Sequence, residues 1–272
     1  MNAARSLGDL DGLYKNRKLV LWVEDELSAA YLAAAWDEPR IGFLVAGSGS
    51  GIAALVESAR RAGLRGVHGL RDRDFGTTNY PWKPGEQSLR LAMHEIENAL
   101  LDPVGLAQCA ELVQRSEGDI RVKLGREAQG MLWGTALAAT LHELNERSQS
   151  GYPGSSIAGV ADRGAALALV TNSTWWQRHG GQAGCLTQQE LEGELDSAQQ
   201  RFAADIQKGE HLTSFAGKQL LDRIWSWLLK APRAGLQPTR IDLAKALGEA
   251  QRLNDRLPAE IEDLRQHLLQ AI

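Results

Sequence analysis

The stretch KLVLWVEDELSAAYLAA, residues 18–34, decides the fold of the first part of the chain. After Lys18 the run to Val23 is apolar, which is typical of a strand buried on both faces of a parallel sheet. Three acids follow at once, and residues 27–36 are rich in Ala and Leu, which predicts a helix. The function of acids directly after a buried strand has to be inferred from the rest of the chain.

The same order of elements recurs downstream. IGFLVAG (41–47) predicts a second strand, GSGSG (47–51) a tight turn, and residues 52–62 a helix. LRGVHGL (64–70) predicts a third strand and SLRLAMH (88–94) a fourth, followed by a strand-to-helix junction in HEIENALLDP (94–103). This alternation predicts an α/β fold built from right-handed βαβ units, with a Rossmann-like parallel sheet and helices on both of its faces.

Beyond Pro103 the composition shifts to long stretches rich in Ala, Leu, Gln and Glu, which predict a mostly helical portion. We expect loops at residues 149–160, 171–184 and 230–238, and two closing helices broken at Leu257-Pro258. The expected organisation is therefore an α/β catalytic domain in residues 1–103 and a helical domain in residues 104–272, which would serve substrate access, dimerisation or partner binding.

Composition limits the possible functions. The chain has 272 residues, 43% apolar, and its net charge of −4 gives no global basic signature of a nucleic-acid binder, so contact with phosphates would need a local patch or bound cations. No run approaches the roughly 20 apolar residues of a membrane span, and MNAARSLGDLDG lacks the apolar core of a secretory signal, so we expect a cytoplasmic protein without membrane contact. Cys109 and Cys185 predict reduced, structural thiols.

Acids end the first and third predicted strands. Glu24 follows the first strand, and Asp72 and Asp74 follow the third in the sequence RDRD. Ligands of parallel α/β sheets bind beyond the carboxyl ends of the strands, so these side chains are expected to meet in one crevice. A cluster of mutually repelling carboxylates is usually compensated by a hard cation, and Mg²⁺ completes its shell with water and substrate phosphate. We therefore expect Mg²⁺ (or Mn²⁺) held by Asp72 and Asp74, with Glu24 as a further acid linked to the metal that handles the proton in chemistry on phosphates.

Two families share an acidic strand end of this kind. VLWVEDE is superficially similar to the opening of the receiver domain of two-component signalling. That family also needs a lone Asp after strand three, a Thr or Ser after strand four and a Lys after strand five. Here strand three ends in a pair of Asp residues, the fourth candidate strand ends at His94, and no fifth strand with a terminal Lys is visible. The receiver is the less favoured hypothesis.

VEDELSAAY, LRDRDFG and HEIENALLDP, in this order, resemble the TOPRIM branch found in OLD-family nucleases and in the DUF4435 family, and most of all the TOPRIM nuclease subunits of PARIS anti-phage systems. The resemblance covers residues 17–103, and the pair Gly217-Lys218 is similar to a later element. It implies a metal-dependent endonuclease acting on nucleic acid, for example host tRNA. It also implies a toxic effector of abortive infection that an ABC-type ATPase partner holds inactive and that acts as a homodimer.

The resemblance also implies roles for residues outside the strand ends. Glu97 and Asn98 would lie at the edge of the site, Glu97 as an additional metal ligand, and Lys218 would stabilise the phosphate. The ordinary alternatives are a helix N-terminal acid and a surface lysine. The usual glycine after the first Glu is Asp25 here, and the acid often found four residues after that Glu is Ser28. A second metal ion would therefore need an oxygen from Asp25, Glu26 or Glu97.

Three further features have plainer interpretations. His94, alone at a strand end, is expected to be structural. GSGSG lacks the Lys of a Walker loop, so a tight turn is favoured over a phosphate site. The Trp175-Trp176 pair, in a polar segment, is a candidate interface. The main rival to the nuclease hypothesis is a non-catalytic interaction module with a TOPRIM-like fold.

Overall fold

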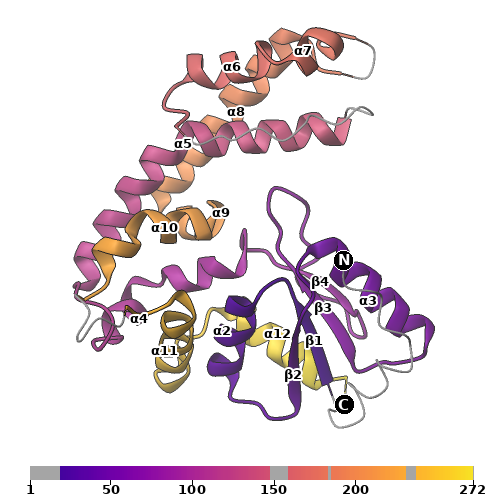
Figure 1. Ribbon diagram of the computed structural model, residues 1–272, viewed down its shortest axis with the longest axis vertical. Helices are drawn as coiled ribbons and strands as arrows, with labels where there is room; N and C mark the ends of the chain where they lie inside the picture. Colours follow the sequence, from indigo (N-terminus) through magenta and orange to yellow (C-terminus); the bar gives the residue numbers. More distant parts are fainter. Residues whose placement is uncertain (1–18, 148–158, 183–184, 231–236, 272) are drawn as a thin grey trace.

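The computed structural model describes residues 19–147, 159–182, 185–230 and 237–271 (Figure 1). The N-terminal part of the chain forms a four-stranded, all-parallel sheet in the order β2-β1-β3-β4 at one end of the molecule (Figure 1). The predicted α/β class with a parallel sheet is therefore confirmed. The strands are β1 (Leu19–Val23), β2 (Ile41–Val45), β3 (Val67–Arg71) and β4 (Ser88–Arg90).

Two strands are shorter than predicted. β3 begins at Val67 rather than at residue 64, because the N–H of Leu64 donates to the Ala59 carbonyl at the end of the preceding helix. β4 ends at Arg90 rather than at residue 94. Beyond it, the N–H groups of Ala92 and Met93 donate to the carboxylate of Glu260 and not to a neighbouring strand.

Helices cover both faces of the sheet, as predicted. All five residues of β1 are buried, which explains the unbroken apolar run in the sequence. On one face, Val20 and Trp22 pack against Ile52 and Val56 of helix α3 (Gly49–Arg61). On the other face lies helix α2 (Glu26–Trp36), in the same hydrophobic cluster as the alternate residues of β1.

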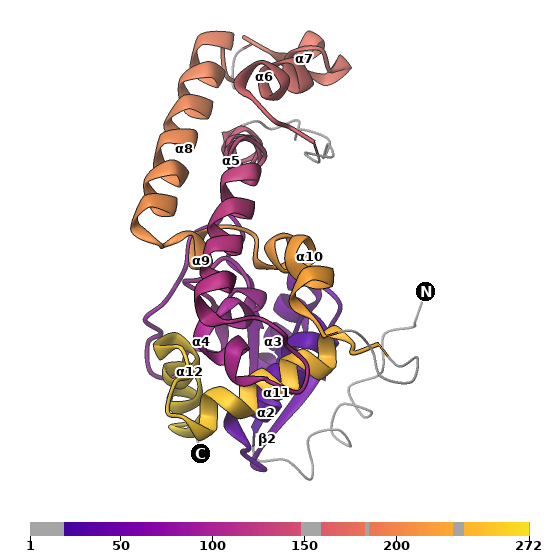
Figure 2. The same cartoon turned by 90° about the vertical axis from the view of Figure 1, so that its left-hand side faces the viewer.

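The described residues beyond the sheet are mostly helical, as predicted. Helices α5 and α8 pack along each other and form a long arm that carries α6 and α7 at its far end (Figures 1 and 2). The elements are η1 (a 3-10 helix, Ile96–Leu101), α4 (Pro103–Gln108), α5 (Glu117–Arg147), α6 (Arg163–Thr171), α7 (Thr174–His179), α8 (Gln188–Lys208), α9 (His211–Ser214), α10 (Gly217–Leu228), α11 (Arg240–Leu253) and α12 (Ala259–Leu269).

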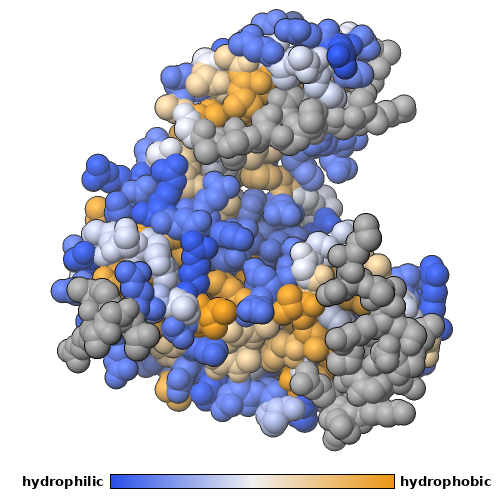
Figure 3. All heavy atoms as spheres, in the orientation of Figure 1, coloured by the Kyte–Doolittle hydropathy of each residue, from blue (hydrophilic) through white to orange (hydrophobic). Residues whose placement is uncertain are grey.

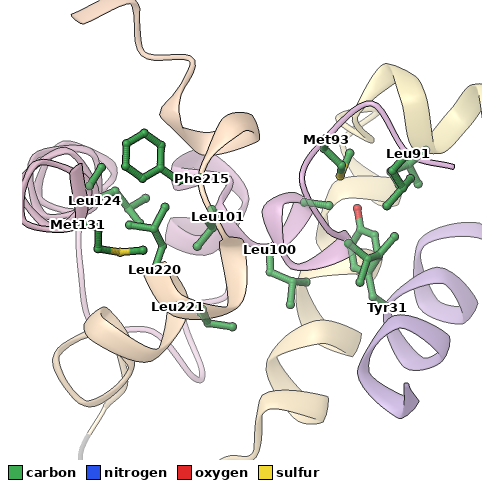
Figure 4. Packing of buried hydrophobic residues seen from close by; sticks show 14 of the residues in the cluster. Tyr31, Leu91, Met93, Leu100, Leu101, Leu124, Met131, Phe215, Leu220 and Leu221 are labelled. Atoms are coloured by element: carbon green, nitrogen blue, oxygen red, sulfur yellow. The ribbon is translucent and has the colours of Figure 1, made fainter. Parts of the chain in front are cut away.

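The last two helices return to the sheet. Helix α11 packs on α2, where the Tyr31 hydroxyl donates to Gln251 Oε1 at 2.7 Å. One hydrophobic core runs from α5 and α10 through Leu100 and Leu101 of η1 to Tyr31 (Figure 4). The boundary at residue 103 stays a prediction, but α11 and α12, which lie beyond it in the sequence, pack against the α/β portion.

One predicted loop is wrong in part. Residues 171–184 contain α7, which begins after Ser173 because its hydroxyl accepts a hydrogen bond from the N–H of Trp176 at 3.1 Å. Trp175 is only 8% exposed, so it belongs to the core rather than to an exposed pair. Most of the expected loops at 149–160 and 230–238 lies outside the described residues. The two closing helices, α11 and α12, flank Pro258 as predicted.

Hydrophilic residues cover most of the face shown in Figure 3, with apolar residues gathered over the tip of the arm and over the lower part of the molecule. In the described part of the chain, no helix combines the length and the apolar character that crossing a membrane requires. Cys109 and Cys185 are both free, as expected, and Cys109 is buried.

Candidate active site

The three consecutive acids after β1 have three different environments. Glu24 is partly buried, and its Oε1 accepts a hydrogen bond from the N–H of Asp72 at 3.4 Å. Asp25 caps α2, since its Oδ1 accepts from the N–H of Ser28 at 2.8 Å. Glu26 is exposed in the first turn of α2, where a negative charge complements the helix dipole. Of the three, Glu24 is the one hydrogen-bonded to a residue that follows β3, while the charge of Asp25 raises the pKa of Glu95 and of Glu97.

The two Asp residues after β3 point to different neighbours. Asp72 Oδ1 accepts a hydrogen bond from the N–H of Ile96 at 3.2 Å. Asp74 has a left-handed backbone with φ of +50°, and the N–H groups of Arg73 and Asp74 both donate to the carbonyl of His94, at 3.0 and 2.9 Å. Asp72 and Asp74, which were expected to hold one ion together, therefore lie on either side of a turn fixed by the His94 carbonyl.

Two groups of possible metal ligands result, and they share one residue. Asp72, Glu95 and Glu97 form one group, and Asp74, His94 and Glu95 form the other. Within each group the three ligand atoms lie within 4.8 Å of one another. The structure thus brings the predicted Asp72 and Glu97 together, and it places Asp74 in the adjacent group. Glu24 is in neither group, although it is hydrogen-bonded to the main chain of Asp72.

Glu95, the shared residue, was missed as a site residue in the sequence, and His94 was set aside. The available signal was the run HEIE directly after a predicted strand, in which acids recur at alternate positions. The role of Glu95 could not be predicted from this run because its backbone changes conformation here: Glu95 precedes η1, and Glu97 lies in the first turn of that helix. Neither a strand nor an α-helix periodicity describes that geometry.

Asn98 holds η1 in place. Its Oδ1 accepts from the N–H of Glu95 at 2.8 Å, and its Nδ2 donates to the carbonyls of Leu212 and Phe215, both at 2.8 Å. The side chain is 5% exposed and all of these contacts are with the main chain. Asn98 therefore positions Glu95 and Glu97 and has no free group directed at a ligand.

The N-terminus of α10 closes the site from the helical portion. The main-chain N–H of Lys218 donates to Glu95 Oε1. Gly217 is required here by packing, because a Cβ at this position would lie 2.6 Å from the Asn98 nitrogen. The Lys218 side chain is exposed, and its charge lowers the pKa of Glu95 and of Glu97, against the larger effect of burial. Gly217 and Lys218 therefore pack directly against the HEIEN segment.

The carboxyl groups of the site are held towards their neutral forms. Burial, followed by the charges of Glu24 and Glu97, raises the pKa of Asp72 to about 9. Burial, followed by the charge of Glu95, raises the pKa of Glu97 to about 7. Burial also raises the pKa of Glu24 and Glu95, and partial desolvation raises that of Asp74 although much of this residue is exposed. The cluster contains more negative charge than the nearby cations compensate.

The donor set fits a hard divalent cation. Carboxylate oxygens are the ligands that Mg²⁺ and Mn²⁺ prefer, and a cation among them would reverse the rise in their pKa values. Burial, followed by the charge of Arg73, lowers the pKa of His94 to about 4, so its ring is neutral at pH 7. Its buried Nδ1 has no hydrogen-bond partner. A neutral imidazole beside two carboxylates suits Mn²⁺ better than Mg²⁺, which prefers oxygen ligands.

Comparison of the chain with protein-family models, with curated proteins and with solved structures finds no match. The resemblance to TOPRIM nucleases therefore depends on the three N-terminal motifs and on the Gly-Lys pair. What the site can do has to be argued from its own residues.

Proposed function

We propose that the chain is a divalent-metal-dependent phosphodiesterase that cleaves nucleic acid, with a fold of the TOPRIM type. The observation that carries this proposal is the gathering of carboxylates from three elements at the carboxyl ends of two adjacent parallel strands. They follow β1 or β3 or lie at the start of η1, and they are Glu24, Asp72, Asp74, Glu95 and Glu97. Such a cluster suits the binding of cations and, through them, of phosphates.

In this proposal Asp72, Glu95 and Glu97 hold one Mg²⁺ or Mn²⁺, and Asp74, His94 and Glu95 are the candidates for a second. A divalent ion bound there supplies compensation for the negative charge that develops on a phosphate during hydrolysis. The chain contributes the fixed positions of the ligands. Asn98 accepts a hydrogen bond from the main-chain N–H of Glu95, and the main-chain N–H of Lys218 donates to the Glu95 carboxylate.

Glu24 is the proposed proton acceptor for the attacking water. Burial raises its pKa, which brings a carboxylate closer to the basicity that general-base catalysis at neutral pH requires. The hydrogen bond from the Asp72 N–H fixes one of its oxygens beside the metal ligands. The exposed Lys218 side chain is proposed to stabilise the phosphate. Lys218 lies in the first turn of α10, and the positive end of that helix also points at the cluster.

The biological role that we propose follows from the motif resemblance. The chain would be the toxic effector of an anti-phage system, held inactive by an ABC-type ATPase and released on infection to act as a homodimer in the cytoplasm. Its substrate would be a host nucleic acid such as tRNA. An ATPase encoded beside this chain would support the proposal.

The test is cleavage by the purified full chain. Labelled tRNA, single-stranded RNA and double-stranded DNA are incubated with Mg²⁺, with Mn²⁺ or with EDTA. We expect cleavage of at least one of them only with a divalent ion. Glu24→Gln should abolish it, and Glu26→Gln should not, because Glu26 is exposed on α2 two residues away and carries the same functional group. Circular dichroism of both variants checks the fold.

Growth arrest is the matching test in cells. Expression of the wild-type chain should stop growth, and Glu24→Gln should relieve the arrest at equal protein level. A wild-type chain that is harmless and cleaves no DNA or RNA would favour the interaction module instead. Uptake of phosphate from acetyl phosphate on a single Asp would favour the receiver.

A further inference from the structure

A pocket of about 640 Å³ lies at the opposite end of β3 from the acidic cluster. It is bounded by the end of α3, the segment that leads into β3, residues 84–87 and the end of α12. The volume is within the range of small-molecule sites in proteins. Neither the sequence motifs nor the proposed function uses it.

The floor of this pocket contains a buried histidine without a hydrogen bond. His68, the second residue of β3, is 1% exposed; neither of its ring nitrogens has a partner in hydrogen-bond geometry, although the Glu86 carbonyl is near enough to favour its protonated form. The nearby Glu86 carbonyl takes its hydrogen bond from His267 Nε2 at 2.8 Å, and the two imidazole rings meet edge to face with centroids 6.0 Å apart. A buried polar group left unpaired costs free energy, which a ligand in the pocket would recover.

The ionisable residues that line the pocket are all basic. They are Arg60, Arg65, His68 and His267, and no carboxylate is among the described lining residues. Glu86, at the edge, uses one carboxylate oxygen on the Asn79 side chain and the other on the N–H of Lys83. Arg60 is paired with Glu57 at 2.9 Å, whereas Arg65 is exposed and makes no ion pair with any described residue. The lining therefore suits an anion.

We propose that this pocket binds a phosphorylated small molecule of nucleotide size, with Arg65 and Arg60 contacting the phosphate and His68 hydrogen-bonding to the ligand from the floor. Guanidinium groups match the oxygens of a phosphate, and the volume exceeds what an inorganic ion fills. His68 and Asp72 are four residues apart on an extended chain, about 13 Å. The ligand is thus distinct from the substrate of the acidic site, and the inference does not depend on the proposed nuclease activity.

The experiment is calorimetric titration of the full chain in EDTA with AMP, GMP, their nucleosides and inorganic phosphate. We expect a Kd below roughly 1 mM for at least one nucleotide and no binding of the matching nucleoside. Arg65→Gln should weaken binding by about tenfold or more. Arg61→Gln, an equally exposed change on α3 outside the pocket lining, should leave the Kd unchanged. His68→Phe keeps the ring, removes both nitrogens and should also weaken binding.

Loss of binding in Arg65→Gln but not in Arg61→Gln supports the site. Absence of binding for both nucleotides, or an equal loss in the two arginine variants, overturns it. Inorganic phosphate binding as tightly as the nucleotides overturns the assignment of a nucleotide-sized ligand. If His68→Phe does not fold, the ¹⁵N imidazole resonances of His68 in the wild-type chain decide, because a bound ligand must shift them and a ligand bound elsewhere leaves them in place.

Discussion

The two ends of β3 differ in a way that one physical rule explains. At the carboxyl end, burial raises the pKa of Asp72 to about 9, and at the amino end, burial followed by the charge of His267 lowers the pKa of His68 to about 4. In both places the charged form is penalised because no adequate counter-charge lies beside it. The uncompensated acids underlie the proposed metal site, and the basic pocket lining, in which Arg60 but not Arg65 is paired with a carboxylate, underlies the proposed anion site. The two proposals therefore give opposite ligands to the two ends.

The largest expected effect is the loss of cleavage in Asp72→Asn. The amide is similar in size to the carboxylate but carries no charge for a cation, so the single-turnover rate with Mg²⁺ should fall by at least about 100-fold, or about 3 kcal/mol in activation free energy. His68→Phe, at the other end of the strand, should keep the rate within about threefold of the wild type. Equal losses in the two variants would contradict the assignment of hydrolysis to the carboxyl end alone.

The second expected effect concerns the residue between the two ends. A Cβ at Gly69 would lie 2.3 Å from Ile52 Cγ2 and 2.6 Å from Val56 Cγ2 of α3, so Gly69→Ala forces the helix away from the strand. Overpacking of this kind lowers the free energy of unfolding by about 1–3 kcal/mol. Urea denaturation measures it. The control is Gly193→Ala on α8, where no atom lies within 4 Å of an added Cβ and the change should stabilise the helix by about 0.5–1 kcal/mol.

The positions of the strands show how much of the fold can be predicted from the sequence. Buried strands are visible as apolar runs, and β1, β2 and β3 were all predicted within a few residues because burial on both faces leaves little choice of residue type. The short β4 was overestimated, since its end is set by Glu260, which approaches from 168 residues further along the chain. No local pattern contains that information.

Some residues of the candidate site could also be predicted from the sequence, and others could not. Glu24, Asp72 and Asp74 could be predicted from their positions after strands, because parallel strands align their carboxyl ends. The sharing of Glu95 by two groups could not, since it depends on the left-handed turn at Asp74 and on the N-terminus of α10. His68 lies within a predicted strand and gave no signal, because its missing hydrogen bonds are visible only in three dimensions.

The pH dependence of stability should separate the two ends. Without divalent ions the folded pKa values of Asp72, about 9, and Glu97, about 7, lie above the ordinary values of 3.8 and 4.5. Their contribution to stability is complete below the ordinary values and is lost as the pH rises towards 9. His68 has the opposite sign, since its pKa is lowered from 6.5 to about 4, and its contribution is lost as the pH falls from 6.5 to 4. Above pH 6.5 only the carboxyl end of the strand should therefore matter.

Denaturation in EDTA at pH 6.5, 7.5 and 8.5 checks this expectation. The wild-type chain should lose between about 1 and 2 kcal/mol of unfolding free energy per pH unit, and Asp72→Asn should lose clearly less. Mg²⁺ should remove most of the wild-type slope, because the ion stabilises the ionised carboxylates. Glu26→Gln is the control, and a flattened slope in that variant would show that general surface charge, rather than the cluster, is responsible.

The smallest expected effect is that of Lys218→Gln. The main-chain N–H that restrains Glu95 remains in this variant, and only the exposed ammonium group is removed. Cleavage should fall by about three- to tenfold, which is about 1 kcal/mol, with kcat rather than KM carrying the loss if the charge acts on the phosphate during reaction. Lys245→Gln on α11 removes an exposed lysine that contacts no acid of the site and should leave both constants unchanged. A loss confined to KM would instead give Lys218 a part in substrate attraction, and the carboxyl end of β3 would then carry out the chemistry without cationic help from α10.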